Sequence, residues 1–170
     1  MSGFEMAELD RRIANLIRLG TVAEADYERA VVRVRSGELL TNWLPWLTRR
    51  AGNDRTWWAP EVGEQVVVLS PSGEIGQGVV LPALYQQAHP ANGNSPDVMR
   101  VDFDDGACVE YNRKTHAMRL ETEGTLTLKA ARHVIVGPVV QSGGDMTSDG
   151  ISAQHHIHPE SIGVKTGEPQ

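Results

Sequence analysis

The chain has 170 residues, which is enough for one ordinary domain or two small ones. Its formal net charge is −6, so we do not expect a nucleic-acid partner, because binding a phosphate backbone needs a concentrated basic face. The N-terminus has no signal-peptide pattern and no apolar run approaches the length of a membrane helix, so we expect synthesis and folding in a cytoplasm.

The first predicted element is an amphipathic helix over residues 3–19. Its apolar residues recur at spacings of two to four, which places them on one wide stripe: Phe4, Met6, Leu9, Ile13, Leu16 and Ile17. Gly20 is well placed to end this helix. The stripe predicts packing against the helix's own domain or against a sister chain.

From Thr21 onward the apolar residues alternate with polar ones, which predicts β-strands. Two paired strands are expected in TVAEADYE and AVVRVRSG. Two more are expected in GEQVVVLSPSGEIGQGVVLPALY, joined by a turn at Pro71 to Gly73. Short strands with turns every 8 to 12 residues are typical of a small β-barrel.

All four tryptophans lie between these strand pairs: Trp43, Trp46, Trp57 and Trp58. We interpret them as packing the barrel core and the contacts between neighbouring barrels. The alternative is a stacking platform for nucleic-acid bases or sugars. Against it, the basic residues nearby are only local and the domain lacks a net basic face.

After the polar loop QQAHPANGNSPD the strands become shorter. They are expected in VMRVDFDDG, ACVEYN, HAMRLETEG, TLTLKA and RHVIVGP. Asp105-Gly106 is a strong hairpin-type signal. The one cysteine, Cys108, excludes an intrachain disulfide and is expected to be a small buried thiol. This stretch has few long apolar side chains, so it predicts a strand-built stalk stabilised by oligomerisation, although further strands of an ordinary sandwich would look similar.

Three of the six histidines lie within four residues near the C-terminus: His155, His156 and His158. In an extended strand, residues two apart point to the same face, so His156 and His158 would project together and His155 would lie opposite. Three chains meeting on an axis would supply six imidazole nitrogens. Such a cage suits an octahedral ion such as iron or nickel better than tetrahedral zinc.

A metal held by six protein ligands has no open position for water or substrate, so it would be structural. The sequence also lacks the nucleophile, zinc-protease and phosphate-loop motifs of common enzymes. We therefore expect neither an enzyme nor a small-molecule substrate. Two alternatives stay open: a disordered His-containing tail, and a metalloenzyme with one metal ion per chain.

The segment TNWLPWLTRRAGNDRTWWAPEVGEQVVVLSPSGE, followed by VLPALY, resembles the baseplate assembly protein V family of contractile-tailed phages and R-type bacteriocins. LDRRIANLIRLGTV, DGACVEYN and SGGDMTSDG before HHIHP match in the same order, so the resemblance covers nearly the whole chain. It implies an all-β chain with an N-terminal helix (1–20), an oligosaccharide/oligonucleotide-binding (OB) barrel (21–95), a trimeric β-helical stalk (96–140) and a metal-capped apex (141–170).

The resemblance further implies a homotrimeric needle at the baseplate tip of the virion, assembled in the host cytoplasm. It would contact the tail tube and baseplate hub and puncture the outer membrane without catalysis. One iron ion per trimer would be bound at the tip by His156 and His158, and calcium or chloride within the trimer stays open. Two departures are a stalk shorter than in long family members and the extra His155, whose role as a ligand we do not expect. An OB barrel that binds a glycan or a nucleic acid, with an incidental histidine tail, is the alternative.

Overall fold

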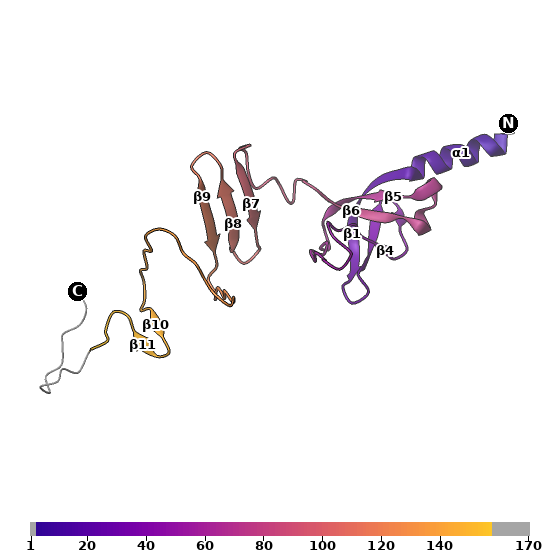
Figure 1. Ribbon diagram of the computed structural model, residues 1–170. Helices are drawn as coiled ribbons and strands as arrows, with labels where there is room; N and C mark the ends of the chain where they lie inside the picture. Colours follow the sequence, from indigo (N-terminus) through magenta and orange to yellow (C-terminus); the bar gives the residue numbers. More distant parts are fainter. Residues whose placement is uncertain (1–2, 158–170) are drawn as a thin grey trace, which may run out of the picture. The chain divides into compact units, whose positions relative to one another are not determined.

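The computed structural model describes residues 3–157 and is mostly β, with one N-terminal helix (Figure 1). The chain forms two compact units, Met1–Gly124 and Thr125–Gln170, which are described separately below. Within the described residues, no helix is both long and apolar enough to cross a membrane.

Helix α1 spans Gly3–Leu16, and strand β1 (Ile17–Asp26) follows it directly. The expected helix end at Gly20 is therefore wrong, since Gly20 lies inside β1. Glu8 forms ion pairs with Arg11 and Arg12 on the polar side of the helix at 2.8 and 2.7 Å. The apolar stripe stays exposed, with Phe4 81% accessible, so a single chain covers little of it.

The predicted barrel is confirmed. Its further strands are β2 (Val31–Ser36), β3 (Leu39–Leu40), β4 (Leu44–Pro45), β5 (Gln65–Leu69) and β6 (Val79–Leu84). The strand order is β3-β2-β1-β5-β6, with β4 also paired to β2. A parallel bridge between Trp46 and Val80 links the end of β4 to β6, and Leu47 N–H donates to the Val80 carbonyl at 2.8 Å. This bridge joins the two ends of the sheet, so the strands close on themselves.

The barrel core is formed by the alternating positions that the sequence marked as apolar. Its members are at most 1% exposed: Val22, Val32, Val34, Leu44, Val66, Val68 and Val80. The strands β5 and β6 are connected by two short 3-10 turns, η1 (Pro71–Gly73) and η2 (Ile75–Gln77). The expected turn at Pro71 to Gly73 is thus confirmed.

Strands β7 (Val98–Asp102), β8 (Cys108–Asn112) and β9 (Ala117–Glu121) form a separate antiparallel sheet in sequence order. The β7–β8 turn contains Asp105-Gly106, as expected, with Gly106 at φ +86°. Cys108 is buried, at 4% exposure, which confirms that prediction as well.

The two faces of this sheet differ in chemistry. One face carries ion pairs that link Arg100 to Asp102 and Glu110, and Arg119 to Glu121. The other face carries the apolar side chains, which the ladder registers bring side by side: Met99, Val101, Val109, Tyr111, Met118 and Leu120. Met118 and Leu120 are 68% and 57% exposed, so this second face, here called the apolar sheet face, is largely uncovered in a single chain.

In the second unit, the only strands among the described residues are β10 (Thr147–Ser148) and β11 (Ile151–Ser152). The strands expected at 125–130 and 132–138 are not formed. A strand needs a hydrogen-bonded neighbour, and the described part of a single chain offers none to these segments. From residue 125 to 157, every residue except Ser152 and His156 is exposed. The domain boundaries expected after residues 95 and 140 stay predictions.

Candidate functional site

The predicted histidine cluster begins just after the short hairpin of β10 and β11. Thr147 pairs with Ser152 and Ser148 with Ile151. The two residues between them, Asp149 and Gly150, both have positive φ, at +48° and +80°. This is the backbone that two-residue hairpins prefer, and Asp-Gly is a favoured sequence for it. The hairpin therefore fixes the point at which the histidine segment starts.

Ser152 redirects the chain as it leaves this hairpin. Its Oγ accepts hydrogen bonds from the backbone N–H groups of Gln154 and His155 at 3.1 and 2.6 Å. A serine hydroxyl that captures nearby N–H groups competes with strand hydrogen bonding, and a turn follows at residues 153–155. The expectation that His155 lies in an extended strand is therefore wrong, and strand geometry does not exclude His155 as a ligand.

His156 is half-buried and has a defined tautomer. Its Nδ1 lies 2.8 Å from the backbone carbonyl oxygen of Ser152. A carbonyl oxygen can only accept a hydrogen bond, so Nδ1 is the donor, and in the neutral imidazole Nε2 then has the lone pair. Metal-binding histidines commonly donate their second N–H to a carbonyl in this way. The imidazole of His156 thus fits a metal ligand that binds through Nε2.

The other predicted ligand, His158, lies outside the described residues. Among residues 3–157, no group of three or more His, Cys, Asp or Glu side chains is placed to hold a metal ion. The described part of one chain therefore supplies one oriented imidazole, that of His156, and not a complete metal site. Metal binding by His156 and His158 stays a prediction.

The tryptophans divide into two pairs. Trp46 packs against the barrel core, as expected, and Trp43 lies beside the guanidinium groups of Arg29 and Arg33, 6.0 and 5.9 Å from its ring centre. Trp57 and Trp58 do not pack the core, since they are 65% and 64% exposed. For these two the core-packing expectation is wrong, while contact with a neighbouring barrel stays a prediction.

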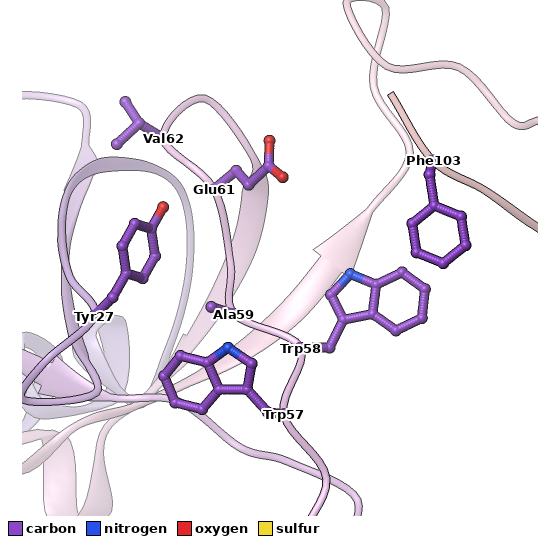
Figure 2. A pocket seen from close by; sticks show the side chains of 7 residues that line it. All are labelled: Tyr27, Trp57, Trp58, Ala59, Glu61, Val62 and Phe103. Atoms are coloured by element: carbon purple, nitrogen blue, oxygen red, sulfur yellow. The ribbon is translucent and has the colours of Figure 1, made fainter. Parts of the chain in front are cut away.

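Trp57 and Trp58 line an open cleft of about 980 Å³ in the first unit, shown in Figure 2. The other residues that line it are Tyr27, Ala59, Glu61, Val62 and Phe103. The ring of Trp57 meets Trp46 edge-on at 5.5 Å, and the ring of Trp58 stacks on Phe103 at 5.9 Å and 6° from parallel. We call this set the aromatic cleft. Sequence reasoning missed Tyr27 and Phe103, because each comes from a different turn far from the tryptophans.

Comparison with known proteins gives two findings. Residues 18–85 match a family model described as the type VI secretion system/phage-baseplate injector OB domain. The chain is also 33% identical over 202 aligned residues to the spike protein of Escherichia phage P2, covering 95% of this chain and 96% of that protein.

Proposed function

Because the chain belongs to the phage baseplate assembly protein V family of tail spikes, we propose that it is the central spike of a contractile phage tail or tail-like particle. In this proposal three copies form a needle at the baseplate tip, with an iron ion at the apex. Sheath contraction drives the needle through the outer membrane of the target cell. The likeness to a spike protein along nearly its whole length supports the role.

The observation that carries the trimer is that the described C-terminal part of one chain has no core. Its apolar side chains are exposed, with Val136 94% and Val140 92% accessible. A segment that buries no apolar surface cannot offset the entropy lost on ordering. Copies of the same chain would supply both the missing apolar contacts and the missing strand partners for residues 125–138.

The apolar sheet face supports the same conclusion for strands β7–β9. Three copies with this face turned toward a common axis would bury it and leave the ion-paired face in water. Tyr111 and Met99, which face each other across the β7–β8 ladder, would then join the interior. Such burial is the dominant favourable term in protein association.

At the apex, His156 from each chain would contribute Nε2, and His158 would contribute the second nitrogen. Three chains then supply six imidazole nitrogens, which suit octahedral iron. When bound, the ion would cross-link three chain ends into one point, and its binding free energy would become folding free energy. The Ser152 carbonyl would hold each His156 in the tautomer whose Nε2 can act as a metal ligand.

In this proposal the spike's action is mechanical. A narrow, fully hydrogen-bonded needle concentrates force and resists splaying, so it needs no reaction to breach a membrane. The barrel, in turn, would attach the needle to the tail tube and baseplate hub. The family is a structural one, and this fits a protein without catalytic chemistry.

The proposal is tested by native mass spectrometry and elemental analysis of the full chain. We expect a mass three times that of one chain and one iron atom per trimer. The double variant His156→Ala/His158→Ala should lose the iron, and His89→Ala is the matched control because His89 lies in an exposed loop. A monomer at micromolar concentration, or one metal ion per chain, would overturn the proposal.

A further inference from the structure

The aromatic cleft exposes more ring surface than a barrel needs for its own packing. Besides the two tryptophans, Tyr27 is 48% and Phe103 47% exposed. Aromatic side chains supply much of the free energy at interfaces when a partner covers them. These side chains come from three different loops and surround one open hollow, which indicates a binding surface.

The polar groups of the cleft are also available. Among the described residues, the indole N–H groups of Trp57 and Trp58 and the phenol of Tyr27 have no hydrogen-bond partner, and the carboxylate of Glu61 has neither a hydrogen bond nor an ion pair. Figure 2 shows the nitrogens of both indoles and the oxygen of Tyr27 on the side of the rings that faces Glu61. The cleft thus offers two N–H donors and one free carboxylate above an apolar floor.

The charge of the cleft is negative. Neither the cleft nor the adjoining hollow, which shares Trp58, Glu61 and Val62 with it, is lined by a lysine or an arginine. The adjoining hollow adds Glu64 and Asp102. Asp102 is engaged by the Arg100 guanidinium and the Asn92 amide, which lower the pKa of its carboxyl, and Glu64 accepts the N–H of Glu61. Glu61 is therefore the carboxylate left for a ligand.

We propose that the aromatic cleft binds an extended, proline-rich segment of another protein that carries one arginine or lysine. Proline-rich chains keep a preformed extended helix and dock on aromatic-lined grooves, so they lose little entropy on binding. Their backbone carbonyls would accept the two indole N–H groups. The cationic side chain would lie on a tryptophan face and reach Glu61. The same acidic cleft would repel the phosphates of a nucleic acid.

This inference deepens the proposed attachment of the barrel to other tail proteins. It rests on that proposal only for the identity of the protein that carries the segment. It needs neither the metal nor the trimer. Its failure can therefore be told apart from failure of the spike proposal.

The test is titration of the full chain with a short fluorescent peptide that has prolines in a repeating P-x-x-P pattern and one arginine. We expect saturable binding that weakens with salt. Trp57→Ala and Trp58→Ala should each raise the dissociation constant at least about tenfold. Phe4→Ala, which removes an exposed ring from α1, is the matched control and should leave binding unchanged.

A double-mutant cycle isolates the charged contact. Glu61→Gln should weaken binding of the arginine peptide several-fold, yet have no effect on the same peptide with glutamine in place of arginine. This variant keeps the size of the side chain, so it tests the proposal even where a tryptophan variant fails to fold. Equal losses for both peptides would contradict the assigned role of Glu61.

Three results would overturn the proposal. The first is no binding of the peptide. The second is tighter binding of an oligosaccharide or a single-stranded oligonucleotide that depends on the same tryptophans. The third is a change of oligomeric mass in Trp57→Ala or Trp58→Ala, which would make the cleft a contact between copies of this chain.

Discussion

Gly20 and Val34 approach so closely across the β1–β2 pair that a β-carbon on Gly20 would lie 2.5 Å from Val34 Cγ1. It would also lie 2.6 Å from the carbonyl oxygen of Arg35. Real β-carbons essentially never come so near to other heavy atoms, so one of the two strands would have to move. Because Val34 is fully buried in the barrel core, a side chain at position 20 would have to displace a packed residue.

We therefore expect Gly20→Ala to lower the free energy of unfolding of the barrel by about 1–3 kcal/mol. The measurement is chemical denaturation followed by tryptophan fluorescence, which reports on the barrel region because all four tryptophans lie there. Gly76→Ala is the matched control, since a β-carbon at Gly76 meets nothing within 4 Å. Equal stability of the two variants would show that the strands accommodate the methyl group.

Gly20 also shows where sequence reasoning failed in the fold. A glycine after a helical pattern predicts a helix end, but here the helix ends at Leu16 and Gly20 serves strand packing. The barrel strands themselves were predictable, because Val32 and Val34 in β2 alternate with polar residues at the period of a strand. The alternation of apolar and polar residues predicts that a segment is a strand. It does not give the register between two strands, on which the close approach at Gly20 depends.

The candidate site was predictable only in part, for two physical reasons. The histidines were visible in the composition of the chain. The turn at residues 153–155, however, depends on the hydroxyl of Ser152, which accepts two backbone N–H groups that a strand would use for pairing. The aromatic cleft joins Tyr27 and Phe103 to the tryptophans through tertiary packing, for which the sequence has no periodic signal. The segments 125–130 and 132–138 have strand patterns, yet they form no strand among the described residues of one chain.

Thr41 provides a second stability prediction. Its Oγ1 accepts the backbone N–H of Val34 at 2.9 Å, and its own N–H donates to the Val34 carbonyl at 2.9 Å. Thr41 is 2% exposed, so Thr41→Val would leave the Val34 N–H buried without a partner. We expect a loss of about 1–3 kcal/mol in unfolding free energy. Thr41→Ser keeps the hydroxyl, so its unfolding free energy should be close to that of the unmodified chain in the same denaturation experiment. If Thr41→Ser is as unstable as Thr41→Val, the hydrogen bond is not the cause.

Glu8 gives a prediction about pH. The hydrogen bonds from Arg11, and then from Arg12, lower the pKa of its carboxyl from 4.5 to about 2. Since the folded pKa lies below the unfolded one, this contribution to helix stability is complete above about pH 4.5 and is lost as the pH falls toward 2. A carbon-detected NMR titration should find the Glu8 midpoint near 2. In Arg11→Gln/Arg12→Gln the midpoint should return toward 4.5, and an unchanged midpoint would exclude the arginines as the cause.

The apolar sheet face gives a prediction about assembly. Met118→Glu/Leu120→Glu would place two carboxylates on this face of β9, where the proposed trimer buries them without partners. We expect the trimer to dissociate at micromolar concentration, as measured by light scattering coupled to size-exclusion chromatography. Ala117→Glu is the control, because Ala117 lies on the opposite, ion-paired face. A trimer that survives the double substitution would mean that this face does not point to the axis.

Ser152 gives the last prediction, on metal retention. Removing its hydroxyl in Ser152→Ala frees the N–H groups of Gln154 and His155, so the turn that brings His156 Nδ1 to the Ser152 carbonyl loses its two supporting hydrogen bonds. Loss of groups that orient a metal ligand typically weakens metal affinity about tenfold to a hundredfold. Competition with a chelator, followed by elemental analysis, should therefore remove the proposed apex iron from Ser152→Ala at a lower chelator concentration than from the unmodified chain. Ser148→Ala removes a hydroxyl from the other strand of the same hairpin, where no side-chain hydrogen bond within residues 3–157 depends on it, and should retain the proposed iron normally. If both variants lose iron equally, the hairpin as a whole holds the site, and the specific orientation of His156 by Ser152 does not explain the affinity.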